Sequence, residues 1–421
     1  MMNPATITLI ILAITAIFFI TEFIPVPLSA MLCATALMLL KIVEPSDVIA
    51  GFGNSNVIII VTMTVVGGAL FETGITGKIT RGALKIAKTE KQMALAIFLI
   101  GAVLSAGLNN TGTMAMMVPL ILGIQASVGY SASKLMMSGL LGVLCGGRLT
   151  LIGDATVNSI AKSAIESVGG TFGFLDIGRI GLPVTIITAL WLYFWGYDHM
   201  PKHKVNTENA VFSEDEVKDV PKWQQIASIV IILSVFFGMA FQKQLGMPLY
   251  EISLIGAVAV CGLRILKGKQ FYNLIDMKTV LLYVGMLPLG TAMSTTGAAQ
   301  LIADGVSYLV GGTGNVYLIV ALVFIVTCFM TQFTSNVVTI NLLAPVLLAL
   351  AVNLNVNPVS LIITAATAAS CGYVSPVSCP PATIIYGNGG FKFSDYIKSN
   401  WTILLITFVM CVVLLPSIFS F

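Results

Sequence analysis

Two short polar motifs interrupt long apolar stretches and carry the side chains best suited to hold a small ion or solute. Residues 109–113 read Asn-Asn-Thr-Gly-Thr and precede Pro119, and residues 335–339 read Ser-Asn-Val-Val-Thr and precede Pro345. Amide and hydroxyl groups donate hydrogen bonds to a carboxylate and offer oxygen atoms to a cation. A helix that starts after such a motif adds free N–H groups and the positive end of its dipole. Helix capping is the alternative interpretation, but it does not explain two matched motifs.

Two further stretches combine helix breakers with polar side chains. Residues 145–158 read Cys-Gly-Gly-Arg-Leu-Thr-Leu-Ile-Gly-Asp-Ala-Thr-Val-Asn, and residues 370–383 read Ser-Cys-Gly-Tyr-Val-Ser-Pro-Val-Ser-Cys-Pro-Pro-Ala-Thr. Glycine and proline unwind the backbone, and freed carbonyl groups can coordinate sodium. A kink made only for packing is the alternative. We therefore expect an ion site built from Asn110, Thr113, Thr150, Gly153, Asp154, Asn336, Ser375 and Ser378.

Arg148 is a charged residue inside one of these apolar stretches. A charge within a membrane span costs at least about 2.5–3.5 kcal/mol and marks a functional site by default. Its expected partner is Asp154, and a purely structural pair with Asp154 is the alternative. A guanidinium binds an anion bidentately, or it takes the place of a coupling cation and favours exchange. The expected substrate ligands are therefore Asn109, Asn110, Thr111, Arg148, Ser335, Asn336 and Thr339.

The composition excludes several classes of protein. Of 421 residues, 57% are hydrophobic and 9% are charged, against roughly 25% charged in an ordinary soluble domain. The chain is therefore an all-α polytopic membrane protein in contact with the lipid bilayer. The net charge of +3 is too small for a nucleic-acid surface. Two histidines in one loop make neither a metal cluster nor an enzyme site, so we expect no catalytic residue, no cofactor and no metal beyond sodium.

Apolar runs long enough to span a bilayer identify the helices that position these motifs. Two longer apolar regions, about 92–170 and 315–387, are broken by Gly, Asn, Pro, Ser and Thr. Broken backbone at membrane depth must be buried in protein or line a cavity, so function is expected there. The eight uninterrupted runs cover about 4–22, 27–44, 55–72, 180–196, 223–241, 249–266, 276–296 and 399–419.

The two halves of the chain match each other. The Asn-x-x-Thr-x-x-x-x-x-Pro spacing recurs in both, and Cys145-Gly146 aligns with Cys371-Gly372. We expect two inverted-topology repeats with about ten crossings and two re-entrant hairpins, which is typical of an elevator-type transporter. The expected boundaries are a first repeat at 1–196 (hairpin about 92–128, broken span about 134–168), a cytoplasmic linker at 197–222, and an inverted second repeat at 223–421 (hairpin about 315–353, broken span about 358–387).

The basic residues predict the orientation in the membrane. With the N-terminus outside, sixteen of the 21 lysines and arginines lie in inner loops. Four lie in outer loops: Lys41, Lys162, Arg179 and Lys243. The remaining one, Arg148, lies within a span. We therefore expect both termini outside a bacterial or archaeal inner membrane. Residues 77–90 are expected to form a basic interfacial helix that links a frame to a moving body, with a partner at about 298–311.

The hairpin tips and the second broken stretch resemble the divalent anion:sodium symporter family, over about residues 4–419. The resemblance implies a homodimeric elevator for di- and tricarboxylates or sulfate. Asn109, Asn110, Thr111, Ser335 and Asn336 fall on that family's paired Ser-Asn-Thr motifs, which hold substrate carboxylates and border two sodium sites. The sequence departs from the pattern at Asn109 and Val337, and residues 146–154 are closer to the arsenite-permease branch.

We therefore expect a secondary active transporter of small anions, above all C4-dicarboxylates. Transport would be coupled to sodium or would exchange one anion for another. A sodium/proton antiporter or a permease for metalloid or inorganic anions is the alternative. That alternative needs a titratable carboxylate at the site, and Asp154 is the best candidate.

Overall fold

The computed structural model describes residues 3–21, 23–74, 87–203, 205, 220–275, 277–302, 304, 315–376 and 378–419. These residues form helices joined by short loops, and the described part of the chain contains no β-strand. Within it, eight helices are long and apolar enough to cross a membrane, and shorter apolar helices accompany them. The prediction of an all-α polytopic membrane protein is confirmed.

The uninterrupted apolar runs form helices close to their predicted bounds. The run at 27–44 is an exception, because its helix ends at Leu39 and a separate short helix begins at Pro45. Proline at the first helical position starts both of these helices. The helices are α1 Pro4–Thr21, α2 Val26–Leu39, α3 Pro45–Phe52, α4 Ser55–Glu72, α10 Gly178–Trp191, α12 Lys222–Ala240, α14 Leu249–Gly262, α16 Met277–Thr295 and α22 Phe393–Ile418.

Four short connecting helices complete this set. A π-helical turn, η1 Leu192–Gly196, and α11 Tyr197–His199 continue α10 to residue 199. The other two are α13 Gln242–Leu245 and α15 Gly268–Leu274, which flank α14 in the chain.

The two broken regions each fold into a helical hairpin followed by an interrupted helix. In the first, the hairpin is α6 Glu90–Gly107 and α7 Asn110–Val128, and the interrupted helix is α8 Ala132–Gly146 and α9 Ala155–Ser167. In the second, the hairpin is α18 Val316–Phe333 and α19 Asn336–Leu354, and the interrupted helix is α20 Pro358–Ala369 and α21 Pro380–Gly389.

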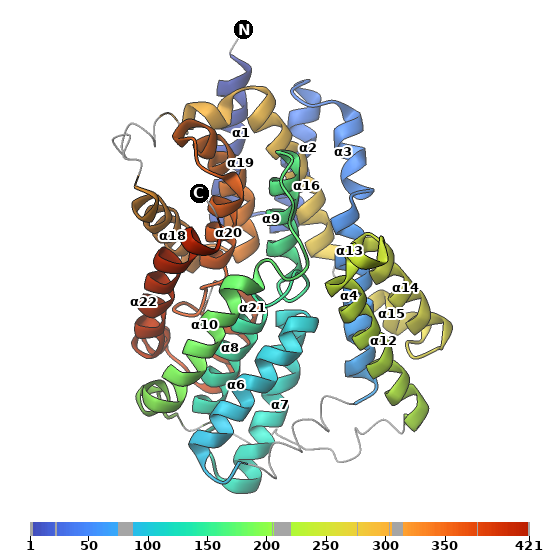
Figure 1. Cartoon of the computed structure of the whole chain (residues 1–421), viewed down its shortest axis with the longest axis vertical. Coiled ribbons are helices and arrows are strands. Elements are labelled where there is room, and N and C mark those ends of the chain that lie inside the picture. The colour runs from blue at the N-terminus through green and yellow to red at the C-terminus, as the bar shows by residue number, and fades with distance from the viewer. Residues whose placement is uncertain are drawn as a thin grey trace.

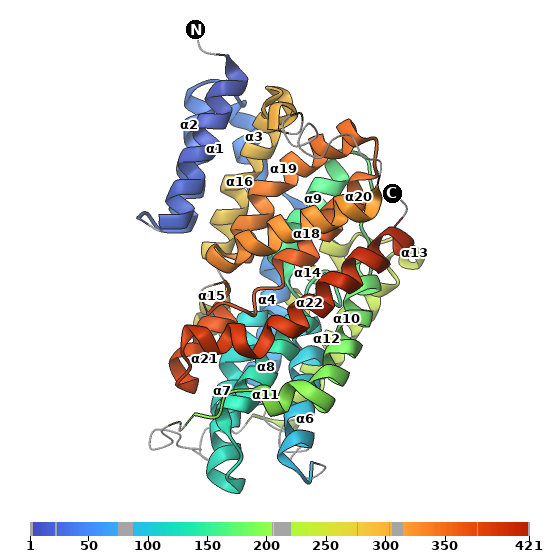
Figure 2. The same cartoon turned by 90° about the vertical axis from the view of Figure 1, so that its left-hand side faces the viewer.

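The interrupted helices cross near the middle of the molecule in opposite directions. In Figures 1 and 2, α8 lies below α9, whereas α20 lies above α21. The hairpin of α6 and α7 occupies the lower part of the view, and α19 lies in the upper part. The packing agrees, because α9 contacts α19 and α20, and α21 contacts α7 and α8. The tips of the two hairpins and the breaks of the two interrupted helices therefore lie at one level near the middle of the molecule.

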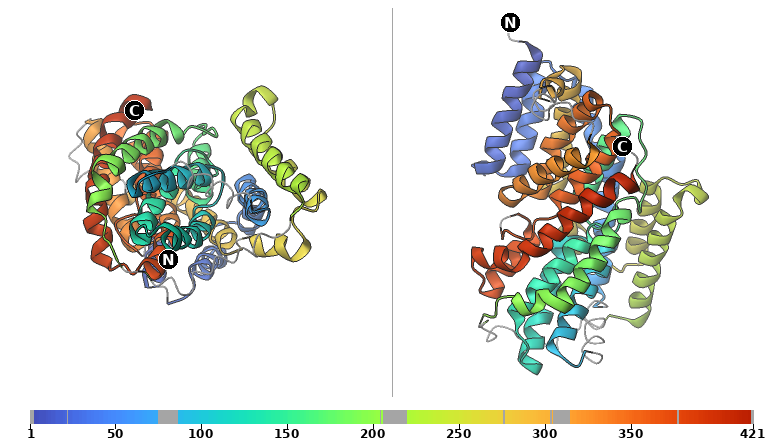
Figure 3. Two further views of the ribbon diagram at one scale, coloured as in Figure 1. Left: turned by 90° about the horizontal axis from the view of Figure 1, so that it is seen from below. Right: turned by 60° about the vertical axis from the view of Figure 1, so that its left-hand side comes forward.

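The helices pack as two groups. The hairpins, the interrupted helices, α10 and α22 contact one another extensively, whereas α1 to α4, α12, α14 and α16 form the other group. Figure 3 shows α12 and α14 standing at the margin of the molecule. Apolar side chains such as Ile226, Phe237 and Val258 are exposed there, as expected where helices face lipid.

Several predicted segments fall largely outside the described residues. The interfacial helix expected at 77–90 lies mostly within 75–86, and its partner at 298–311 mostly within 303–314. Most of the linker at 197–222 is likewise not described. All seven cysteines are free, and the described residues contain no metal-binding cluster of His, Cys, Asp or Glu.

Candidate functional site

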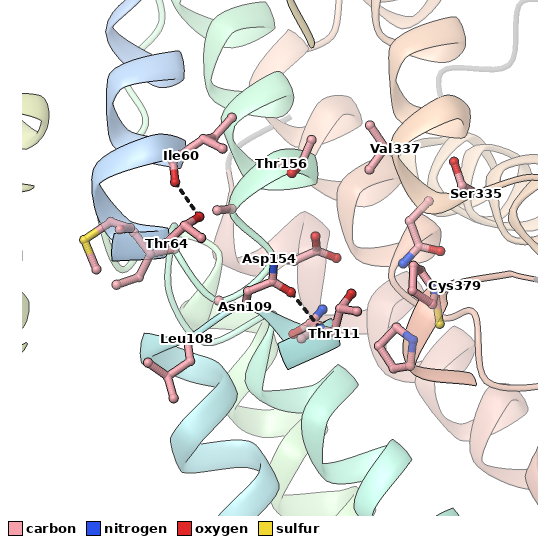
Figure 4. A pocket seen from close by; sticks show the side chains of 18 of the residues that line it. Ile60, Thr64, Leu108, Asn109, Thr111, Asp154, Thr156, Ser335, Val337 and Cys379 are labelled. Atoms are coloured by element: carbon pink, nitrogen blue, oxygen red, sulfur yellow. Dashed lines mark hydrogen bonds between the residues drawn. The ribbon is translucent and has the colours of Figure 1, made fainter. Parts of the chain in front are cut away.

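The tips of both hairpins open onto one small pocket of about 140 Å³. This is less than the roughly 300–1,000 Å³ of typical ligand clefts, so the pocket suits a small solute. Figure 4 shows Asn109 and Thr111 on one side, Ser335 and Val337 on the other, and Asp154 between them. The described lining residues are Ile60, Met63, Thr64, Gly107, Leu108, Asn109, Asn110, Thr111, Ile152, Gly153, Asp154, Ala155, Thr156, Ser335, Asn336, Val337, Cys379, Pro380 and Pro381.

The first tip is held by hydrogen bonds within its own hairpin. Asn109 caps α7, and its Oδ1 accepts a bond of 2.7 Å from the Thr111 backbone N–H. Oδ1 of Asn110 accepts a bond from the Ser105 hydroxyl, five residues earlier. The Asn110 amide also packs against Gly147, where an added Cβ would lie 2.8 Å from Nδ2. The tip is thus fixed before any ligand binds.

The second tip is built in the same way. Ser335 caps α19, and its hydroxyl accepts a bond of 3.2 Å from the Val338 N–H. The carbonyl oxygens of Ala369 and Ser378 lie 2.9 and 3.2 Å from the Asn336 amide, so its nitrogen faces them. Thr331, again five residues before the asparagine, lies 2.8 Å from the same amide. Each tip asparagine therefore joins its own hairpin to the break of the neighbouring interrupted helix.

The first break is closed by side chains that bond to its backbone. Nδ2 of Asn158 donates to the carbonyl oxygens of Gly147 and Thr150, at 3.1 and 3.0 Å. The Asp154 N–H donates to the Gly147 carbonyl at 3.0 Å, and the Thr150 hydroxyl donates to the carbonyl of Ala106 in the hairpin. The carbonyls of Gly147 and Thr150 in the first break thus accept hydrogen bonds from within the protein.

The second break uses equivalent positions. The Thr383 hydroxyl donates to the backbone carbonyl of Pro376 at 2.7 Å, and the Ser378 hydroxyl donates to the backbone carbonyl of Ser375 at 2.9 Å. Asn158 and Thr383 both lie three residues after the first residue of their helix, α9 or α21. In both breaks, side chains near the start of the following helix therefore bond to the backbone of the loop.

Arg148 and Asp154 do not form a direct ion pair, so the expectation that they pair is corrected. Nη2 of Arg148 donates to the Ser370 carbonyl at 3.1 Å, and the Ser370 hydroxyl donates to Oδ2 of Asp154 at 3.4 Å. Nε of Arg148 donates to the carbonyl of Leu144 at 3.3 Å, and the guanidinium lies 5.7 Å from the ring of Tyr373. Ser370 at the end of α20 thus separates the two charges and links the two halves of the chain.

Seven of the predicted site residues line the pocket, and six do not. Arg148 is fully buried beside it, so the structure does not place it against a substrate. Thr113, Thr150, Thr339, Ser375 and Ser378 are buried behind the tips and breaks. The residues that line the pocket are Asn109, Asn110, Thr111, Gly153, Asp154, Ser335 and Asn336.

Sequence reasoning missed several lining residues. Thr156 lies in the first turn of α9, two residues after Asp154, and its place at a helix start after a break is the signal that would have found it. Cys379, Pro380 and Pro381 come from the equivalent start of α21. Thr64 lies in α4, which is an uninterrupted apolar helix, so the sequence around it gives no signal that it lines a pocket.

This arrangement defines a membrane transport protein rather than an enzyme, and comparison with known proteins agrees. The family model described as CitMHS, citrate transporter, matches residues 16–251 and 239–421. The chain belongs to this citrate transporter family.

Characterised and uncharacterised relatives extend the comparison. An uncharacterised transporter of Haemophilus influenzae is 27% identical over 97% of this chain and 90% of its own length. The sodium-dependent dicarboxylate transporter SdcS of Staphylococcus saprophyticus is 23% identical over 96% of this chain and 84% of its own.

Solved structures share the fold at low sequence identity. The YdaH transporter of Alcanivorax borkumensis superposes with a TM-score of 0.67 at 12% identity, covering 99% of this chain and 98% of its own. The MtrF protein of Neisseria gonorrhoeae gives 0.64 at 14% identity, covering 99% and 94%.

Proposed function

We propose that this protein is a secondary active transporter of small anions, above all C4-dicarboxylates, coupled to sodium or to a counter-moving anion. The observation that carries the proposal is the meeting of two matched hairpin tips at one small pocket. Each tip presents the start of a long helix, α7 or α19, where N–H groups and the helix dipole favour an anion. Asn109, Asn110, Thr111, Ser335 and Asn336 are the proposed substrate ligands.

Inverted repeats account for the symmetry of the site. The equivalent interrupted helices run in opposite directions through the same level of the molecule, and Ser105 matches Thr331 as the partner of a tip asparagine. A pseudo-twofold axis through the pocket would produce this relationship. The proposed repeats keep the boundaries predicted from the sequence, with both termini outside the membrane and a homodimer as the assembly.

An elevator movement is supported by the division into two helix groups. A second cavity of about 510 Å³ lies between α9 and α19 of one group and α16 of the other. Helix α9 borders both cavities, with Thr156 on the site pocket and Ser163 on the second cavity. Sliding of α9 and α19 along α16 would carry the pocket from one side of the membrane toward the other.

The relatives support the substrate class and the coupling ion. SdcS is described as a sodium-dependent dicarboxylate transporter. The alignment covers 96% of this chain and 84% of SdcS. The lining of amides, hydroxyls and helix N-termini suits carboxylate groups, and sodium is the proposed coupling ion. A sodium/proton antiporter or a permease for inorganic anions is the second candidate, because Asp154 lines the pocket.

Uptake into proteoliposomes tests the proposal. Radiolabelled succinate is offered with and without an inward sodium gradient, and with and without unlabelled succinate inside. We expect uptake driven by sodium or by internal anion. Absence of uptake under every condition would refute dicarboxylate transport, and sodium-driven proton movement without succinate uptake would favour the antiporter.

A further inference from the structure

A third cavity lies away from the transport pocket, where α14 ends. It has a volume of about 590 Å³ and is lined by the end of α14, the loop that follows and α15. Arg264 and Lys267 are its basic lining residues, and both are exposed. Among the described residues that line the cavity, none is acidic. The lining therefore offers positive charge to a ligand.

Aromatic rings line the same cavity. Phe271 and Tyr272 of α15 lie with their ring centroids 5.4 Å apart in an edge-to-face arrangement. Phe271 packs partly against the apolar core, whereas Tyr272 is 73% exposed. Tyrosine next to basic residues is typical of the level at which a membrane protein meets lipid headgroups. Arg264 and Lys267 are also among the basic residues that the sequence predicts on the inner side of the membrane.

An exposed apolar stripe on α14 leads to this cavity. Leu254 and Val258 are 46% and 62% exposed, and Cys261, which lines the cavity, follows three residues after Val258. Residues at spacings of four and three lie on one face of an α-helix. Helix α14 stands at the margin of the molecule (Figure 3), so the stripe faces the surroundings of the protein. An acyl chain lying along the stripe would bring its headgroup to Arg264 and Lys267.

Arg264 has a backbone conformation that glycine or asparagine usually supplies at the end of a helix. Its φ is 52°, and its N–H donates to the Cys261 carbonyl at 3.0 Å. Nε2 of Gln224, at the start of α12, donates to the Arg264 carbonyl at 3.3 Å, so the turn is held against the neighbouring helix. Lys41 has the same conformation after α2, with a φ of 55°. The turn alone therefore does not make a site, and the cavity with its charges and rings is what distinguishes Arg264.

We propose that this cavity binds the headgroup of an anionic phospholipid, with Arg264 and Lys267 holding its phosphate and an acyl chain lying along Leu254 and Val258. Charge complementarity favours an anionic headgroup, because basic residues at a membrane surface attract anionic lipids. The apolar stripe favours a lipid over a free phosphate, which has no chain to bury. None of the described residues that line this cavity lines the transport pocket, so the site is separate from the proposed substrate site.

Native mass spectrometry of the purified full-length protein tests the assignment. The protein in detergent is titrated separately with dioleoyl phosphatidylglycerol, with dioleoyl phosphatidylcholine and with glycerol 3-phosphate. We expect the first phosphatidylglycerol to bind about tenfold more tightly than phosphatidylcholine, because two basic residues contribute. Equal binding of the two lipids would overturn the anionic headgroup. Glycerol 3-phosphate that binds as tightly as the lipid, and loses this binding when Arg264 is replaced, would show a site for free anions instead.

Variants that keep the turn but remove the charge locate the binding. Arg264→Asn and Arg264→Gly suit the left-handed conformation, and each is expected to weaken phosphatidylglycerol binding about fivefold, as is Lys267→Gln. The double variant Arg264→Asn with Lys267→Gln should bind both lipids equally.

Two control variants should keep the affinity of the parent protein. Lys41→Asn makes a matched change in the same turn conformation, and Lys202→Gln removes an exposed charge from the same predicted side of the membrane. Melting temperatures establish that each variant is folded. A preference for phosphatidylglycerol that persists in the double variant, or that Lys202→Gln lowers as much as Arg264→Asn does, overturns the site.

Discussion

The hairpin-tip asparagines depend on glycines in the facing breaks. Asn110 packs on Gly147, and an added Cβ at Gly372 would lie 2.7 Å from the Ser378 hydroxyl and 3.0 Å from the Asn336 amide. Neither glycine has a positive φ, so a small side chain is excluded by space and not by backbone strain. These glycines set how deeply each asparagine sits beside the pocket.

We predict that Gly147→Ala and Gly372→Ala each lower the transport rate by about 10- to 100-fold while the protein still folds. The added methyl group displaces the asparagine amide, and misplacement of a binding group by about 1 Å has effects of this size. Initial rates of succinate uptake and the elution profile of the purified variants measure the two properties. Gly262→Ala is the control, because nothing lies within 4 Å of its added Cβ. Unchanged uptake in both variants would contradict this account of the tips.

Arg148 shows how a single buried charge can be held without an acidic partner. Two carbonyl oxygens and an aromatic ring surround it, and its Nη1 has no hydrogen-bond partner among the residues that the structure describes. Burial of a charge costs several kcal/mol unless neighbouring dipoles compensate for it. The Ser370 carbonyl lies at the end of α20, where the helix dipole is negative, and this explains why a cation is tolerated there.

At the level of elements, side chains near each break bond to the backbone of the loop. Asn158 bonds two carbonyl groups across the loop between α8 and α9, and Thr383 bonds the loop before α21. Without such donors, the buried backbone of these loops would lose hydrogen bonds that hold it in place. The loop geometry, and hence the direction of Asp154, follows from these bonds.

Asn158→Ala is expected to destabilise the protein by about 1–3 kcal/mol, because it removes two buried hydrogen bonds that cross the first break. The melting temperature of the purified protein should therefore fall. Thr35→Val is the comparison, since its hydroxyl is exposed and bonds only within α2. A melting temperature equal to that of the parent protein would show that the break holds its shape without this amide.

At the level of the whole molecule, a polar cluster joins the two helix groups. Nδ2 of Asn56 on α4 donates to the hydroxyl of Ser163 on α9 at 2.8 Å, and Tyr283 on α16 lies 2.6 Å from the same hydroxyl. Lys162 on α9 donates to Oδ1 of Asn56 at 3.4 Å. These bonds must break if α9 slides past α4 and α16.

We therefore predict that bridging α9 to α4 stops transport. Cysteines replace Asn56 and Ser163 together, and mercuric ion links the two thiols. Uptake by the double variant should fall at least tenfold with mercuric ion and recover with dithiothreitol, and each single variant should keep its uptake. Full uptake by a double variant shown to be bridged would argue against an elevator movement between these groups.

The sequence predicted the helical elements well because membrane insertion imposes a strong physical constraint. A bilayer requires about 20 apolar residues per span, so the spans are visible in composition alone. The hairpins and breaks were visible because Asn, Gly and Pro are costly at membrane depth unless their backbone is buried. The predicted end of the helix at 27–44 was less accurate, because apolar residues continue beyond the observed helix end at Leu39.

The site was predicted only in part. The tip residues Asn109 and Ser335 reach the pocket because they cap helices, which local sequence can indicate. Arg148 and the hydroxyls of Thr150 and Ser378 were expected there, but they bond to backbone behind it, and Ser375 is buried outside the pocket lining. A polar residue in an apolar segment must find partners, and the sequence does not show whether those partners are ligand or protein.

The amino-acid pattern alone therefore establishes the membrane class, the positions of most helices and the pairing of two polar tips. Those features follow from hydrophobicity and local backbone chemistry, which act over a few residues. The tertiary structure decided which polar groups face a common pocket, and it placed Ser370 between Arg148 and Asp154. That contact joins residues more than 200 positions apart, so it depends on how α8, α9 and α20 pack and cannot be read from either segment by itself.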